Sequence, residues 1–274
     1  IIEKIKRYSF DLYTGKNALH FLRGFNIIFR SPSCLPTTLQ LKSEQKRGAI
    51  ITSEIEMLIN VCPCKVIGVT GSDGKTTTTT LIYEILKAGG YTCHLGGNIG
   101  IPLFTKAKEF NENDIVVLEL SSFQLMGMEI SPDISVITNI SPNHLDKHSS
   151  YEEYIDAKKT IFEYQDKDCK LVLNYDNEIT RELAKEAPAK VEFFSRKEKL
   201  EDGVIYDKGT IKECEEGVRK HILDVENVHL KGAHNYENIC AAIAATSDLV
   251  DCQTQAKAIC EFKGVEHRLE FVRE

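Results

Sequence analysis

The densest group of residues able to do chemistry lies at 71–77 (GSDGKTT), where an apolar segment meets a glycine-rich loop, a lysine and several threonines. Gly71 and Gly74 allow backbone N–H groups to turn inward and form a concave anion site. The N-terminus of a following helix adds unpaired N–H groups and the positive end of its dipole. Lys75 can neutralise terminal phosphates, and the Thr76 hydroxyl can bind Mg²⁺. The pattern therefore predicts a phosphate loop that binds a nucleotide.

This loop departs from the full phosphate-loop pattern in one place, because Val69 stands where that pattern has its first glycine. The alternative is an ordinary glycine-rich turn between a strand and a helix, with Lys75 in solvent. The threonine run 76–80 argues against that alternative, since β-branched residues are poor helix formers. Something other than helix propensity must favour a helix here.

Glu119 and His144 each follow an apolar segment, so parallel strands would place both at the carboxyl edge of one sheet. Ligands of open α/β sheets bind at that edge. A carboxylate there can hold Mg²⁺ beside the phosphate loop, and the alternative is that Glu119 caps the next turn. His144 lies in the polar segment 139–146, which leaves both a functional and a structural role open. We expect His148 on the surface.

Lys158 occupies an unusual position on a predicted helix. At about 100° per residue, Tyr151, Tyr154, Ile155 and Phe162 form one stripe, and Lys158 falls in its middle. A lysine among such neighbours is costly unless it is paired, chemically altered or snorkelling to solvent. From this pattern alone, snorkelling is the ordinary explanation.

These residues need a scaffold, and continuous apolar runs predict strands covered on both faces, as in a mostly parallel α/β sheet. We expect strands at 25–29, 49–52, 65–70, 114–120, 134–139 and 169–174. We expect helices at 37–47, from Ser53, for about 15 residues after the phosphate loop, and at 150–164, 177–187, 235–249 and 254–262. Segment 60–65 resembles a linker, and the charged stretch 199–222 with its glycine turns predicts a β excursion.

The composition is that of a globular protein, with 274 residues, 42% hydrophobic, 27% charged and a formal net charge of −7. Net acidity argues against nonspecific nucleic-acid binding, which needs basic side chains. No apolar run approaches the roughly 18 residues of a membrane-spanning helix, so we expect no membrane insertion. Nine irregularly spaced cysteines fit thiols kept reduced in the cytoplasm. Cys62 and Cys64 lack the usual spacing of zinc ligands, and we interpret them as loop cysteines.

Five regions of the chain match one enzyme family. They are GVTGSDGKTTTTTLI (68–82), GGNIGIPL (96–103), LELSSFQL (118–125), NISPNHLDKHSSYEEYIDAKKTIF (139–162), and LKGAHNYENICAA with HRLEF (230–242 and 267–271). Together they resemble the ATP-dependent Mur ligases from about Phe25 onward. The phosphate loop is common to all Mur and folylpolyglutamate ligases, whereas ELSSFQL and GGNIG favour the member that adds D-glutamate.

The resemblance implies an amide-forming ligase of cytoplasmic peptidoglycan precursor synthesis. ATP would phosphorylate the carboxylate of UDP-N-acetylmuramoyl-L-alanine, and the amine of D-glutamate would attack the resulting acyl phosphate. By motif position, Lys75 would contact the transferred phosphoryl group, and Thr76 and Glu119 would hold one Mg²⁺. His144 and Lys158 would serve a second Mg²⁺ and the substrate carboxylate, with Lys158 carrying CO₂ as a carbamate. The implied protein is a monomer with these two small molecules as partners.

Further positions resemble binding residues of the family. The loop residues implied to contact nucleotide are Gly71, Ser72, Asp73, Gly74, Lys75, Thr76 and Thr77. The more distant ones are Asn235, Asn238 and Arg268. Those that resemble substrate contacts are Asn98, Ser122 and His144.

Two departures from the family pattern affect these expectations. Asp73 stands where the family usually has Asn, and its added negative charge predicts somewhat weaker ATP binding. Ser31-Pro32-Ser33 replaces a usual Ser-Pro-Gly, which puts the expected loop turn in doubt.

The implied fold is a Mur-ligase central P-loop ATPase domain over 61–264, preceded by a partial Rossmann-like, UDP-substrate-binding domain over 1–60. Residues 265–274 would start a C-terminal domain. Because the sequence begins at Ile1 rather than Met and the family is longer, we expect a chain truncated at both ends, and inactive by itself because the D-glutamate site lies in the C-terminal domain.

Two other functions stay open. One is another Mur or folylpolyglutamate-type ligase, against which ELSSFQL argues. The other is a nucleotide-binding module without catalysis, against which the joint presence of Lys75, Glu119, His144 and Lys158 argues.

Overall fold

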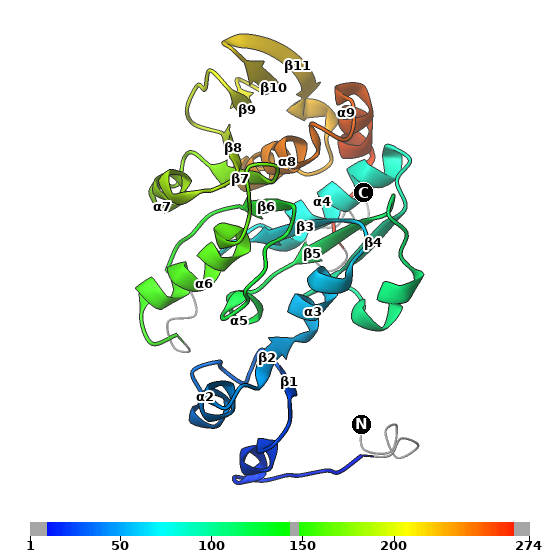
Figure 1. Ribbon diagram of the computed structural model, residues 1–274. Coiled ribbons are helices and arrows are strands. Elements are labelled where there is room, and N and C mark those ends of the chain that lie inside the picture. Colours follow the sequence, from blue (N-terminus) through cyan, green and yellow to red (C-terminus); the bar gives the residue numbers. More distant parts are fainter. Residues whose placement is uncertain (1–9, 143–147, 266–274) are drawn as a thin grey trace. The chain divides into compact units, whose positions relative to one another are not determined.

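The structure is a computed structural model that describes residues 10–142 and 148–265. Its chain divides into two compact units between Ser53 and Glu54 (Figure 1). Two of the predicted site residues, His144 and Arg268, lie outside the described residues.

The first unit is built on a two-stranded parallel sheet in which Ile27 lies opposite Ile50. Its elements are η1 (Ala18–Leu22), β1 (Ile27–Arg30), α2 (Leu39–Lys46) and β2 (Ile50–Ser53). A small core of Ile28, Leu41 and Ala49 joins them. The strands and the helix expected here are confirmed to within two residues, while a Rossmann-like character for this unit stays a prediction.

The second unit contains a nine-stranded sheet in the order β11-β10-β9-β8-β7-β6-β3-β5-β4 (Figure 1). Its strands are β3 (Lys65–Thr70), β4 (Cys93–Gly97), β5 (Ile115–Glu119), β6 (Ile134–Ile137), β7 (Lys170–Asn174), β8 (Lys190–Ser195), β9 (Gly203–Asp207), β10 (Thr210–Glu215) and β11 (Val218–Asp224). Neighbours pair in parallel from β4 across to β9. The mostly parallel α/β fold is thus confirmed.

Strands β9, β10 and β11 form the β excursion expected at 199–222 and pair antiparallel. The pairing of β10 with β11 shifts register between Ile211 and Lys212, as at a β-bulge. Strand β11 ends the sheet and leaves its first four residues, 218–221, exposed.

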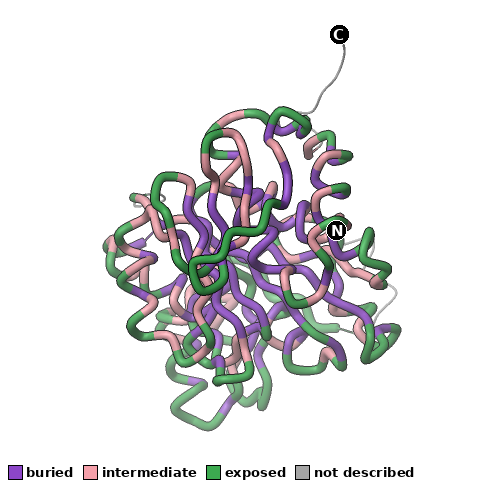
Figure 2. The backbone as a smooth tube through the Cα atoms, turned by 90° about the horizontal axis from the view of Figure 1, so that it is seen from above, coloured by how far each residue is buried: buried purple, intermediate pink, exposed green. Residues whose placement is uncertain are grey.

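Helices cover both faces of this sheet. They are α3 (Glu54–Val61), α4 (Lys75–Ala88), η2 (Phe104–Glu109), α5 (Ser122–Leu125), α6 (Tyr151–Glu163), α7 (Glu178–Leu183), η3 (Ala184–Glu186), η4 (Val225–Asn227), α8 (Ala233–Thr246) and α9 (Cys252–Glu261). One apolar core joins α4, α8 and α9 to strand residues such as Ile67 and Val69. A second core joins α3, α5, α6 and α7 to the intervening residues, such as Val66. Alternate strand residues therefore face opposite layers, and Figure 2 shows the buried backbone running between them.

Helix α4 forms despite its threonine run because tertiary contacts replace helix propensity. Thr76, Thr78 and Thr79 are buried against the rest of the unit. The Thr79 and Thr80 hydroxyls donate to carbonyls one turn earlier, at 2.7 and 2.8 Å. The helix ends at Ala88 before a glycine pair, as the sequence predicts.

A buried ionic cluster ties β7 and β8 to the end of α8. Lys170 Nζ lies 2.6 Å from Glu192 Oε2 and 2.9 Å from Asp248 Oδ2, and it donates to Ser247 Oγ at 2.8 Å. The side chains of Lys170 and Glu192 are 7% and 15% exposed. Burial raises the pKa of Glu192, and Lys170 is the main opposing influence.

Replacing Lys170 with Met should leave the Glu192 carboxylate without its cationic partner in a poorly solvated position. We expect the free energy of unfolding, measured by urea denaturation, to fall by about 3 kcal/mol. Lys185→Met is the matched control, because the Lys185–Glu182 pair is exposed and should contribute less than about 0.5 kcal/mol. Adding Glu192→Leu to Lys170→Met should recover most of the loss; equal stability of the two single variants would contradict the role of the cluster.

Candidate active site

The predicted phosphate loop runs from the end of β3 into α4 and is held by the segment after β6. Gly71 has φ +150°, and a Cβ built on it would lie only 1.9 Å from Thr138 Oγ1. Thr138 Oγ1 donates to the Asp73 carbonyl at 2.6 Å. Asn139 Oδ1 accepts from the Asp73 N–H at 3.0 Å, and the Ser72 N–H donates to the Asn139 carbonyl at 2.9 Å. The loop shape is therefore fixed by the neighbouring strand, and residue 71 must be glycine.

The other side of the loop contacts helix α8. Gly74 has φ +80°, and a Cβ on it would lie 2.2 Å from Asn238 Oδ1. The same oxygen accepts from Thr78 Oγ1 at 3.3 Å, and Asn235 Nδ2 donates to the Lys231 carbonyl at 2.9 Å. The structure thus brings Asn238, predicted from a segment 160 residues away, against the phosphate loop.

Two lysines point at one carbonyl of the loop. Lys75 Nζ donates to the Gly71 carbonyl at 3.0 Å and to the Ser72 carbonyl at 2.9 Å. Lys158 Nζ donates to the Gly71 carbonyl at 2.9 Å and to Thr70 Oγ1 at 3.2 Å. The candidate catalytic lysines therefore lie together at the loop.

Lys158 is 1% exposed, so the snorkelling explanation is wrong. Its Nζ lies 4.7 Å from the centroid of the Tyr154 ring. Desolvation, together with the positive charge of Lys75, lowers the pKa of Lys158 to about 7, and the Asp73 carboxylate partly opposes this shift. Near neutral pH this buried amine is thus partly uncharged.

Glu119 ends β5 inside the same site. Its Oε2 accepts from Thr76 Oγ1 at 2.6 Å and its Oε1 accepts from Asn98 Nδ2 at 2.9 Å. The turn that follows has its own capping box, formed by Ser121 and Gln124. The alternative role of Glu119 as the cap of that turn is therefore wrong, and the carboxylate faces the loop threonine instead. These oxygens are of the type that Mg²⁺ prefers.

Two contacts near the site involve residues to which the sequence assigns no role. Tyr154 OH lies 2.9 Å from Ser72 Oγ and links α6 to the phosphate loop. His148 is buried, with its Nε2 2.9 Å from Ser122 Oγ, so its expected surface position is wrong. The helical stripe that includes Tyr154 is a signal for its burial, whereas His148 lies outside any periodic segment.

Within residues 10–142 and 148–265, no three His, Cys, Asp or Glu side chains lie close enough together to hold a metal ion. Cys62 and Cys64 are free thiols with sulfurs 3.3 Å apart. The same stretches contain no helix long and apolar enough to cross a bilayer.

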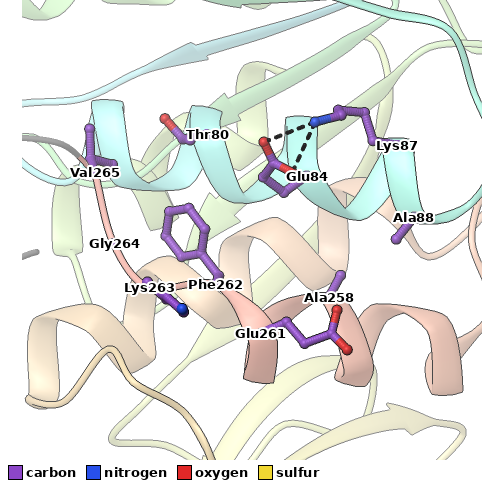
Figure 3. A pocket seen from close by; sticks show the side chains of 10 residues that line it. All are labelled: Thr80, Glu84, Lys87, Ala88, Ala258, Glu261, Phe262, Lys263, Gly264 and Val265. Carbon is purple, nitrogen blue, oxygen red and sulfur yellow. Dashed lines mark hydrogen bonds and ion pairs between the residues drawn. The ribbon is translucent and has the colours of Figure 1, made fainter. Parts of the chain in front are cut away.

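A separate hollow of about 620 Å³ lies between α4 and the end of α9 (Figure 3). Its lining includes Thr80 and Glu84 from α4 and Phe262 from the segment after α9. None of its lining residues belongs to 71–77, so this hollow is not the phosphate site.

Comparisons with known proteins all point to the same protein family. The sequence profile described as the Mur ligase middle domain matches residues 69–246. A UDP-N-acetylmuramoylalanine–D-glutamate ligase of Clostridium kluyveri is 49% identical over 274 residues, covering 100% of this chain and 59% of that protein. An identically named protein of Ruminiclostridium cellulolyticum is 50% identical over 260 residues, covering 95% of this chain and 56% of that protein. The chain thus spans less than two thirds of these relatives.

Solved structures show the same fold. One, titled UDP-N-acetylmuramoyl-L-alanyl-D-glutamate–2,6-diaminopimelate ligase, matches with a TM-score of 0.62 at 20% identity and covers 99% of this chain and 68% of its own. A UDP-N-acetylmuramoylalanyl-D-glutamyl-2,6-diaminopimelate–D-alanyl-D-alanyl ligase from Acinetobacter baumannii matches with a TM-score of 0.63 at 16% identity, covering 90% and 62%.

The buried Lys158 should make stability depend on pH. Its folded pKa of about 7 lies below the ordinary value of 10.5, so between these pH values the unfolded state binds more protons. The free energy of unfolding should therefore rise with pH from 7 to 10 through this group. In Lys158→Met this contribution is absent. The free energy of unfolding of the wild type, relative to that of Lys158→Met, should therefore increase as the pH rises.

Urea denaturation at several pH values measures this difference, since other titrating groups cancel between the two proteins. Lys159→Met is the control, because Lys159 is more exposed and pairs with the exposed Glu186. Parallel pH profiles for wild type and Lys158→Met would contradict the assignment.

Proposed function

This chain belongs to the Mur ligase family, and on that premise we propose that it provides the ATP-binding middle domain of the ligase that adds D-glutamate to UDP-N-acetylmuramoyl-L-alanine. The observation that carries the proposal is the convergence of Lys75, Thr76, Glu119 and Lys158 on one loop. It occurs in a chain 47–50% identical to proteins of that name. The reaction serves peptidoglycan precursor synthesis in the cytoplasm.

The phosphate loop would contribute to phosphoryl transfer through its backbone and through Lys75. Backbone N–H groups of 71–77 and the N-terminus of α4 would hold the phosphates of ATP. Lys75 would leave the Gly71 and Ser72 carbonyls and neutralise charge on the transferred group. The absence of a side chain on Gly74 leaves room for Asn238 beside this loop. Asn235 and Asn238 would contact the nucleotide, and we propose the same role for Arg268, which lies outside the described residues.

The oxygens of Thr76 and Glu119 fit a hard divalent cation, because a hydroxyl and a carboxylate are ligand types that it prefers and the two side chains are buried side by side. They would hold one Mg²⁺, which when bound supplies charge neutralisation and orientation to the phosphates. Asn98 orients the Glu119 carboxylate through its second oxygen. His144 and Lys158 would serve a second ion, and Asn98, Ser122 and His144 the substrate.

Lys158 suits this role as a carbamate. An uncharged amine attacks CO₂, its nitrogen loses a proton, and the product is an anion able to bind a metal. The pKa of about 7 supplies the uncharged amine near neutrality, whereas an ordinary lysine would be almost wholly protonated. The chemistry turns an unfavourable buried cation into a ligand.

We also propose which part of the chain belongs to which domain. Residues 1–60 would belong to the UDP-substrate-binding domain, 61–264 to the ATP-binding domain, and 265–274 to the start of a domain that supplies the D-glutamate site. The partners are two small molecules, and we propose that the protein acts as a monomer.

The test is a substrate panel on the full-length protein that contains this chain. ADP and phosphate should form only when UDP-N-acetylmuramoyl-L-alanine and D-glutamate are both present. Release of ADP and phosphate is measured with each amino acid in turn. Equal turnover with L-lysine or meso-diaminopimelate would exclude D-glutamate specificity.

A second test addresses the carbamate. Lys158→Ala in the full-length protein should abolish ligase activity, and short carboxylates such as formate or acetate should restore part of it by replacing the lost anion. Lys159→Ala, one residue along the same helix, should retain activity. Full activity of Lys158→Ala without added carboxylate would refute the carbamate.

A further inference from the structure

A buried histidine joins α5 to α6 beside the proposed site. The side chain of His148 is fully buried, and its Nε2 lies 2.9 Å from Ser122 Oγ. Phe123 stacks on one face of the imidazole, with ring centroids 4.6 Å apart. Tyr154 meets it edge-on at 5.2 Å and continues to Ser72 of the phosphate loop through a 2.9 Å hydrogen bond. His148 therefore has its ring fixed on several sides.

A carboxylate faces the other ring nitrogen. His148 Nδ1 lies 3.6 Å from Glu153 Oε1. The other oxygen of Glu153 accepts from the Ser149 N–H at 3.1 Å, which fixes the carboxylate. This separation is longer than a hydrogen bond, but the negative charge attracts an N–H dipole and so favours the tautomer with its proton on Nδ1, facing the carboxylate. His148 Nε2 is then the acceptor, and the Ser122 hydroxyl donates to it.

The direction of this hydrogen bond decides what Ser122 can recognise. A hydroxyl has one proton and two lone pairs, and here the proton is directed to His148. The Ser122 oxygen is left as an acceptor, so it pairs with N–H or O–H donors and repels a carboxylate. Ser122 begins α5 three residues after Glu119, at the carboxyl edge of the sheet where substrate would bind.

We propose that His148, held by Glu153, is a positioning residue that makes Ser122 a hydrogen-bond acceptor for an amide N–H or a hydroxyl of the acyl substrate. This inference rests on the proposed function, since it names the substrate group that Ser122 meets. An apolar ring would fill the same space beside Phe123 without burying a polar group. The histidine is thus explained by what it does to the serine hydroxyl.

The test uses the full-length ligase with His148→Phe, Ser122→Ala and the double variant. Phe keeps the stacking on Phe123 but removes the acceptor. We expect His148→Phe to raise the KM for the UDP-linked substrate about tenfold, with the KM for ATP within twofold of wild type. The double variant should be no worse than Ser122→Ala. His221→Phe, on the exposed start of β11, is the control and should match wild type.

His148→Gln guards against misfolding of the Phe variant, because its side-chain oxygen can replace Nε2 as acceptor and should restore much of the substrate KM. Wild-type kinetics in His148→Phe, or effects of the two single changes that multiply in the double variant, would overturn the inference. The tautomer is read separately from ¹⁵N shifts of the imidazole in the folded protein. A proton on Nε2 would overturn the inference even if the proposed ligase activity is correct, whereas an inactive wild type would overturn the proposed function instead.

Discussion

The close approach of the phosphate loop to the end of β6 is the constraint on which the rest of the site depends. Only a glycine can occupy position 71, because any side chain would collide with Thr138. This contact aims the Gly71 carbonyl at both Lys75 and Lys158. It also fixes where α4 begins, and thereby places Thr76 against Glu119. Adjacent strands β3 and β6 make the approach possible.

The unusual chemistry of Lys158 depends in turn on this backbone contact. The lysine is buried because α6 packs its aromatic stripe on the sheet, and its amine finds acceptors at the loop. Tyr154 contacts both, since its ring lies against the Lys158 amine and its hydroxyl shares a hydrogen bond with Ser72 Oγ. One helix therefore couples the electrostatics of the lysine to the shape of the loop.

Local patterns in the sequence predict much of this arrangement. The apolar strands, the glycine loop and the helix after it follow from period and residue type, as does the placement of Glu119 at a sheet edge. Strands β4 and β8 do not, because CHLGG contains two glycines and KVEFFS mixes charged with apolar residues and has no continuous apolar run. For these segments pairing with neighbours, rather than propensity, decides the structure.

The errors at the site have a different cause. A helical stripe shows which face of α6 is apolar but not how deeply Lys158 is covered, and depth decides between snorkelling and burial. His148 lies in an irregular segment before α6 and contacts Ser122, 26 residues earlier in the chain. No local period reports such a contact. Long-range packing therefore determines the features that local sequence leaves open.

The last strand of the sheet has a consequence beyond this site. An uncovered β-strand offers unpaired N–H and C=O groups to any other chain, which is a route to aggregation. Here the outermost ladder contains a bulge, and β11 exposes two consecutive cationic side chains, Arg219 and Lys220. A second copy docking edge to edge would bring like charges together along an irregular ladder. The antiparallel excursion thus ends the sheet at its β11 edge in a form that resists pairing with another chain.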